Sequence, residues 1–202
     1  STLFPYTTLF RSTRFPSGVA VAQSALLANG RIAMGEVAGA KAFDRALSWL
    51  PLYHDMGLVG FVLMPLIFQM SVDLMPTGAF VRRPLLWLEL ISRNRATFSY
   101  SPTFGYELAA RRCDAAALAK LDLTCWRVAG VGGDMVRPNV LRTFAETFAP
   151  AGFDGDGLTV SYGMAEATLA LTYEPGLGLR TDTIDRDRLE HDAVAAPVGD
   201  HT

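Results

Sequence analysis

Residues 161–168 read SYGMAEAT and directly follow the apolar run GLTV at 157–160. An apolar run followed by an aromatic residue and a carboxylate predicts a buried strand that ends near Tyr162 and Glu166. In open α/β sheets, ligands gather at the carboxyl ends of the strands. A Tyr, a Gly and a Glu there suit a nucleotide that carries a divalent cation. A plain turn, with Ser161 capping a following helix, explains these eight residues equally well.

Outward from this stretch, short β-type runs alternate with helical segments from about residue 46 to residue 171. Pro84, Pro102 and Pro138 each lie near a predicted helix start, where a missing N–H costs little. Such alternation predicts parallel strands with right-handed crossovers. We therefore expect an α/β fold, a mostly parallel sheet with flanking helices. The predicted strands are 47–50, 72–75, 96–99, 127–130 and 158–161, and the predicted helices are 57–70, 84–94, 103–112 and 138–148.

The composition of the 202 residues restricts the possible classes of protein. Half of the residues are hydrophobic and 19% are charged, which permits a sizeable core and argues against global disorder. The net charge of −2 argues against nucleic acid as the main partner. Cys113 and Cys125 are too few for a disulfide framework and lack metal-ligand spacing, so we expect two buried or half-buried thiols in a reducing compartment.

The most apolar segment, residues 57–70, is about 14 residues long and contains Pro65. A membrane span needs about 20 apolar residues, so this segment is expected to be a buried helix and not a membrane anchor. The first residues show no secretory signal. These features predict a cytoplasmic protein that is not integral to a membrane.

The two ends of the chain differ from the alternating region. Residues 1–12, STLFPYTTLFRS, show no helical or strand period, and we expect them to be a non-native leader. From Glu174 the chain is rich in Gly, Pro, Asp and Arg, which predicts an irregular tail. The expected organisation is a leader at 1–12, a partial domain at 13–173 and a tail at 174–202, cut from a longer protein.

A second block, SWLPLYHDMGL at 48–58, reads as a strand, a turn and an apolar helix. His54 in the turn could border a pocket walled by that helix and contact a carboxylate substrate. Alternatively, Asp55 is a helix N-cap and His54 is a hydrogen-bonded turn residue. For this block alone, the second interpretation is favoured.

Three further stretches could line a site. The aromatic turn YSPTFGYEL at 100–108 could contact an apolar acyl chain, although such a stripe is more often core. The GVGGD turn at 130–134 allows close backbone approach, but it lacks the full dinucleotide-binding glycine pattern. Residues 12–19, STRFPSGV, could be the remnant of a phosphate-holding loop or a plain turn.

Taken together and in order, these blocks closely resemble the fatty-acyl-AMP ligases of the adenylate-forming, AMP-binding superfamily. The blocks that carry the resemblance are WLPLYHDMGL at 49–58, RRPLLWLELISRNRATFSYSPTFGYELAARR at 82–112, the helix that starts at Arg137-Pro138, and YGMAEATL at 162–169. The resemblance runs from about Thr13 to Thr172. It implies that the chain is part of the large domain of such an enzyme.

The resemblance also implies roles for individual residues. Tyr162 would stack on adenine, with the backbone of 132–134 on the other side, and Glu166 would ligate Mg²⁺ on the ATP phosphates. His54 would lie beside the acyl carboxylate. The expected catalytic residues are Glu166 and His54, and Glu166 is the expected metal ligand. The expected nucleotide contacts are Gly132, Gly133, Asp134, Ser161, Tyr162, Gly163, Met164 and Thr13, and the expected substrate contacts are His54, Tyr100, Phe104 and Tyr106.

The sequence departs from the family pattern at the phosphate loop, where Ser17 stands in the place of the usual lysine. The later aspartate and the catalytic lysine of the family's C-terminal domain are not present, and neither Lys41 nor Lys120 matches a family motif. We therefore expect the 202-residue chain by itself to be inactive. The tail from Glu174 falls where these ligases carry a family-specific insertion.

The resemblance implies an ATP- and Mg²⁺-dependent ligase of fatty acid and lipid metabolism, including lipid and polyketide biosynthesis. It would convert a fatty acid to an acyl-adenylate and pass it to an acyl carrier protein or a polyketide synthase carrier domain. One alternative is an acyl-CoA synthetase, which differs in its acceptor. An alternative of another class is a non-catalytic fragment that binds nucleotide or acyl groups without turnover.

Overall fold

The computed structural model describes residues 3–7, 18–173 and 175–198. Its centre is a six-stranded sheet with the order β4-β3-β5-β6-β7-β8. The strands β3 to β7 run parallel, and β8 runs antiparallel to β7 at one edge. The expected fold class is therefore confirmed. The strands are β3 (Arg45–Ser48), β4 (Ser71–Leu74), β5 (Phe98–Ser101), β6 (Val128–Val131), β7 (Leu158–Gly163) and β8 (Ala170–Tyr173).

The bounds of four predicted strands are shifted by one or two residues, and β7 ends two residues later than predicted. Two of these shifts have a local reason. In the first, Trp49 and Leu50 leave the sheet because the Leu50 N–H donates to the Ser48 side chain instead of to a neighbouring strand (3.1 Å). The third begins two residues late, at Phe98, because Arg95 ends the preceding helix in a left-handed conformation (φ 56°). The hairpin strand β8 was missed altogether.

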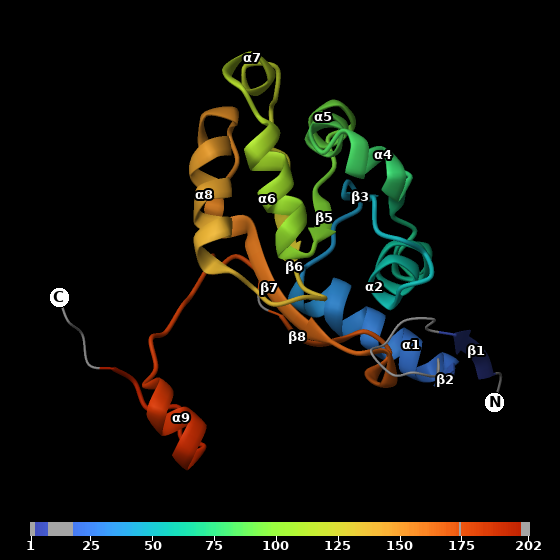
Figure 1. Ribbon diagram of the computed structural model, residues 1–202. Helices are drawn as coiled ribbons and strands as arrows, with labels where there is room; N and C mark the ends of the chain where they lie inside the picture. The colour runs from blue at the N-terminus through green and yellow to red at the C-terminus, as the bar shows by residue number, and fades with distance from the viewer. Residues whose placement is uncertain (1–2, 8–17, 174, 199–202) are drawn as a thin grey trace.

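One face of the sheet is covered by α5 (Leu85–Asn94), α6 (Thr103–Arg112) and α8 (Pro138–Phe148). The predicted bounds of α6 and α8 are correct, because a proline precedes or opens each helix and an apolar stripe follows. Helix α8 buries Leu141, Phe144 and Phe148 against the sheet. The short helices α4 (Thr77–Arg82) and α7 (Ala115–Leu118) extend this side of the molecule (Figure 1).

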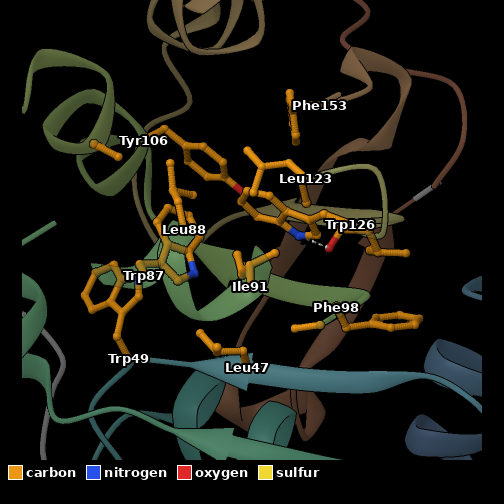
Figure 2. Packing of buried hydrophobic residues seen from close by; sticks show 14 of the residues in the cluster. Leu47, Trp49, Trp87, Leu88, Ile91, Phe98, Tyr106, Leu123, Trp126 and Phe153 are labelled. Carbon is orange, nitrogen blue, oxygen red and sulfur yellow. Dashed lines mark hydrogen bonds between the residues drawn. The ribbon is translucent and has the colours of Figure 1, made fainter. Parts of the chain in front are cut away.

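The core between these helices and the sheet is an aromatic cluster (Figure 2). Trp87 packs edge-on against Tyr106 and Trp126, with ring centroids 5.3 and 5.1 Å apart. Each of the three polar groups has a partner: Trp87 Nε1 donates to Ser99 Oγ (2.8 Å), and the Tyr106 hydroxyl and Trp126 Nε1 donate to strand carbonyls (both 2.9 Å). This network joins α5, α6 and the turn before β6 to the sheet and leaves these buried polar groups satisfied.

The opposite face is covered by helices of mixed geometry. Helix α1 (Gln23–Gly30) continues as the π-helical segment η1 (Arg31–Val37). The predicted helix 57–70 is helical from α2 (Asp55–Leu58) through the π-helical η2 (Val59–Leu63) to α3 (Met64–Ile67). A second apolar cluster, Ala33, Val59, Met64 and Ala165, holds these segments together. Helices on both faces are what a parallel sheet requires.

The remaining elements are short. Although residues 1–12 show no strand period, the backbone of β1 (Leu3–Thr7) pairs antiparallel with β2 (Gly18–Ala22). Beyond the sheet, α9 (Arg186–Asp192) buries none of its residues and lies apart from the sheet in Figure 1. The other elements in the described part of the chain are the 3₁₀ turns η3 (Ala149–Ala151), η4 (Gly155–Gly157) and η5 (Ala165–Ala167).

Candidate functional site

The eight residues 161–168 form the end of β7 and the turn into β8. Ser161 lies inside β7, where its hydroxyl donates to the carbonyl of Val131 (3.1 Å), so the expectation that it caps a helix is wrong. A 3₁₀ turn carries Glu166, and the chain then returns as β8. Tyr162 is 59% exposed and Glu166 is exposed. Thr168 closes the turn at φ 76°, a strained conformation for a β-branched residue.

His54 ends the turn that follows β3 and is the N-cap of α2, so the alternative that makes Asp55 the cap is wrong. Its Nδ1 lies 2.7 Å from Asp55 Oδ1, and the Met56 N–H lies 2.7 Å from the same oxygen. The Asp55 side chain is only 14% exposed, whereas that of His54 is 37% exposed. The carboxylate therefore anchors the ring while the ring remains accessible.

The glycine turn after β6 lies next to the end of β7. Gly133 has φ 74°, a conformation that residues with a side chain rarely adopt, and a Cβ there would approach the Met56 methyl to 3.2 Å. Asp134 Oδ1 accepts from the Met135 N–H (2.7 Å), which holds the carboxylate against its own turn. The turn thus presents backbone on the side where α2 begins.

These three segments border one cavity of about 600 Å³. Its size is that of ordinary small-molecule sites. Polar groups and glycines come from the ends of β3, β6 and β7, and apolar side chains come from η1, η2, β5 and β8. The expected residues that line the cavity are His54, Tyr100, Gly133, Asp134, Ser161, Tyr162, Gly163 and Glu166.

Other expected residues lie elsewhere. Tyr106 is fully buried in the aromatic core, where its hydroxyl donates to the Gly130 carbonyl. Phe104 packs edge-on against Trp49 (5.7 Å between centroids). Both residues lie on α6, which covers the face opposite the cavity, so neither lines the cavity that Tyr100 borders. Gly132 and Met164 do not line the cavity either, and Thr13 lies outside the described residues.

The apolar wall of the cavity was only partly visible in the sequence. The helix after His54 contributes Gly60, Phe61 and Met64, as expected from its position. The remaining apolar lining was missed because its residues lie far apart in the sequence and in no common motif: Val19, Ala33, Met34, Ala46, Phe98, Leu169, Ala170 and Tyr173.

Two phenols face this apolar space. The Tyr100 ring lies directly over Gly130, where any Cβ would approach it to 2.0 Å, and packs edge-on against Phe61 (5.9 Å). Burial raises the pKa of Tyr100 well above its usual range, and Tyr173 adds to this effect. Burial likewise raises the pKa of Tyr173. Both hydroxyls therefore stay protonated at neutral pH.

The cysteines and the acidic residues form no further metal or disulfide site among the described residues. Cys113 and Cys125 are unpaired and half-buried, as expected, and burial raises the pKa of both thiols. Among the residues that the structure describes, no group of three or more His, Cys, Asp or Glu side chains is placed to hold a metal ion. No helix in the described ranges is both long and apolar enough to cross a membrane.

Comparison with known proteins identifies relatives of the whole alternating region. The sequence pattern of the family described as AMP-binding enzyme matches residues 12–199. A Caulobacter vibrioides protein named "Putative acyl-CoA synthetase" is 59% identical over 93% of this chain and 33% of its own length. A medium-chain-fatty-acid–[acyl-carrier-protein] ligase of Teredinibacter turnerae is 40% identical over 80% of this chain and 25% of its own length.

A solved structure from work on fatty acyl-adenylate ligases of E. coli and L. pneumophila superimposes with a TM-score of 0.92 and 44% identity. The match covers 98% of this chain and 36% of that structure. The chain thus spans about a third or less of the length of the relatives described here.

The raised pKa of Tyr100 gives a testable dependence of stability on pH. The unfolded phenol ionises near pH 10, whereas the folded one does not, so its contribution is complete below pH 10 and is lost as the pH rises above it. In the full-length protein, raising the pH from 8 to about 10.5 should reduce the free energy of unfolding less in Tyr100→Phe than in wild type, by up to about 1 kcal/mol. Urea unfolding at both pH values measures this difference. An identical reduction in both proteins would show that Tyr100 is not buried as described.

Proposed function

The chain belongs to the family of AMP-binding enzymes, and we propose that the full-length protein joins a fatty acid to AMP and then transfers the acyl group to a carrier-protein thiol. The observation that carries this proposal is the two-part cavity. Its mouth has an exposed aromatic ring, a glycine turn and a carboxylate at the strand ends, and its inner part is lined by apolar side chains. An acyl-adenylate has the same division into a nucleotide and a hydrocarbon chain.

The nucleotide end of the proposed site consists of Tyr162 and the turn at 132–134. The Tyr162 ring offers an exposed face for adenine, and Gly133 and Asp134 border the same cavity. Ser161 and Gly163 continue the same rim. We propose that adenine stacks on Tyr162, because stacking tolerates the exposed position and needs no buried charge.

The proposed metal is Mg²⁺ held by Glu166. The Glu166 carboxylate is exposed and lines the cavity, and the described residues provide no cluster of several metal ligands. This arrangement fits Mg²⁺, which is usually held by one or two carboxylates together with substrate phosphates and water. Bound there, the cation would neutralise charge on the phosphates of ATP.

The first half-reaction forms a bond between a carboxylate oxygen of the fatty acid and the α-phosphorus of ATP, and pyrophosphate leaves. We propose that His54 lies beside the acyl carboxylate, because its ring is anchored by Asp55 at the boundary between polar mouth and apolar wall. Holding two anions in line for attack requires positioning and charge stabilisation more than acid–base chemistry. In the second half-reaction the carrier thiol attacks the acyl carbonyl, loses its proton, and AMP leaves.

For the organisation of the chain, we propose that residues 13–173 are part of the AMP-binding domain and that 174–202 are a family-specific insertion. The absence of buried residues in α9 supports the second assignment. An enzyme with this substrate would work in the cytoplasm, with an acyl carrier protein or a polyketide synthase carrier domain as its partner and without nucleic acid. The carrier-protein ligase among the relatives supports this acceptor.

A second candidate is an acyl-CoA synthetase, which shares the first half-reaction and differs in the acceptor. The name of the Caulobacter vibrioides relative favours it. The two candidates differ in which thiol consumes the acyl-adenylate, so the choice of acceptor decides between them.

Replacement of the proposed metal ligand provides a test of the site. In the full-length protein, Glu166→Gln should reduce ATP–pyrophosphate exchange by about 30-fold or more, because it removes a charged contact worth about 2 kcal/mol or more in the transition state. The control is Glu146→Gln on the exposed side of α8, which should keep the wild-type rate. If Glu166→Gln stays within about threefold of wild type, Glu166 has no role in metal binding.

The acceptor test addresses the proposed function itself. With ATP, Mg²⁺ and a fatty acid, the full-length protein should accumulate acyl-adenylate, detected by mass spectrometry. Addition of a holo carrier protein should then release AMP and form the carrier thioester, whereas coenzyme A should yield little thioester. Efficient formation of acyl-CoA would identify the protein as an acyl-CoA synthetase. Binding of ATP without adenylate formation from any fatty acid would contradict both enzyme assignments.

A further inference from the structure

The inner end of the cavity lies at the amino ends of the central strands. Ala46 of β3 and Phe98 of β5 are paired side by side on neighbouring parallel strands, and both line the cavity. They are 1% and 2% exposed. The mouth lies at the opposite ends of the strands, at His54 and Tyr162, so the cavity follows the sheet face along the strand direction. Phe98 points away from Trp87 and Tyr106 of the aromatic core (Figure 2).

Arg127 lies against the Phe98 ring. Its guanidinium carbon is 4.7 Å from the ring centroid, within cation–π range. The same guanidinium donates to the Ala38 carbonyl (2.7 Å) and pairs with Asp44 Oδ2 (2.6 Å). The Asp44 side chain is fully buried, so Arg127 ties the loop between η1 and β3 across this end of the sheet. The ion pair with Asp44 therefore fixes the Arg127 guanidinium, and the guanidinium in turn holds the Phe98 ring in place.

A second hollow of about 750 Å³ lies at this same edge of the sheet. Arg127 lines it together with Thr97, Phe43 and Trp126. Phe98 lines the first cavity but not the second, and Arg127 lines the second but not the first. The stacked pair of Phe98 and Arg127 therefore forms a partition between the two spaces.

We propose that this partition sets the maximum length of the acyl chain. The inference rests on the proposed function, in which the hydrocarbon chain enters from the mouth and runs along the sheet face. Its terminal methyl would meet the side chains of Phe98 and Ala46, which offer no hydrogen-bonding group, so the preferred substrate ends in an apolar alkyl group. Because Arg127 prevents the Phe98 ring from moving aside, fatty acids with even one more methylene than the cavity holds should be poor substrates.

The test compares chain-length profiles in the full-length protein. Adenylate formation is measured as pyrophosphate release with saturated acids of about 6 to 20 carbons. Phe98→Ala should open the partition. The ratio of kcat/KM for an acid about four carbons longer than the wild-type optimum to kcat/KM for that optimum should then rise by roughly tenfold or more. Ala46→Leu should narrow the same end and shift the profile toward shorter acids by a similar factor. A general loss of stability cannot produce opposite shifts.

Arg127 is replaced together with Asp44, because removing Arg127 alone would leave the buried Asp44 carboxylate without its ion-pair partner. The double variant Arg127→Met/Asp44→Asn should extend the profile in the same direction as Phe98→Ala. Two matched controls should keep the wild-type profile: Phe153→Leu in the aromatic core, and Arg45→Met/Asp73→Asn, another ion pair at the same edge of the sheet. If Phe98→Ala does not fold, the chain-length profiles of Phe98→Leu, Ala46→Leu and the Arg127→Met/Asp44→Asn double variant test the proposal instead.

An active wild type whose Phe98, Ala46 and Arg127 variants all keep its chain-length ratios within about threefold would overturn this inference and leave the proposed function intact. A wild type that forms adenylate from no fatty acid would instead overturn the proposed function, and this inference with it.

Discussion

The register of β6 against β7 determines where the polar groups of the site lie. Val131 is paired with Val160, so the next residues of each strand emerge together at the carboxyl edge. The Ser161 hydroxyl closes this edge by donating to the Val131 carbonyl. Two residues further along, the Gly133 turn and the Tyr162 ring border the same cavity. A slip of one residue would turn the side chains of β7 to the opposite face and separate these groups.

The two faces of the sheet have different roles. One face is close-packed by aromatic rings whose polar atoms bond to strand carbonyls, which makes the strand positions rigid. The other face leaves room for a cavity, and its wall includes the π-helical segments η1 and η2. Such segments are rare and concentrate at functional sites. The rigid face thus supports the face that would bind substrate.

The sequence predicted the elements that local chemistry determines. Prolines and an apolar stripe defined α6 and α8, and the alternation of elements predicted the parallel sheet. The hairpin strand β8 was not predicted, because nothing in Ala170–Tyr173 signals a reversal of direction; the reversal depends on the strained turn at Thr168. The family resemblance implied that Tyr106 contacts the substrate together with Tyr100, yet the helix turns it to the opposite face. Phe98, Arg127 and Asp44 meet only through the tertiary fold, so no local pattern could identify them.

The central claim is that one cavity holds both the nucleotide and the acyl chain, with the strand ends at its mouth and Phe98 at its inner end. The most direct test is a crystal structure of the full-length protein with a non-hydrolysable acyl-adenylate analogue. We expect adenine against Tyr162 and the Gly133-Asp134 backbone, and the hydrocarbon chain along the wall that Phe61 and Tyr100 form, directed toward Phe98. An analogue bound with its hydrocarbon chain outside this cavity, or with adenine remote from Tyr162, would contradict the account.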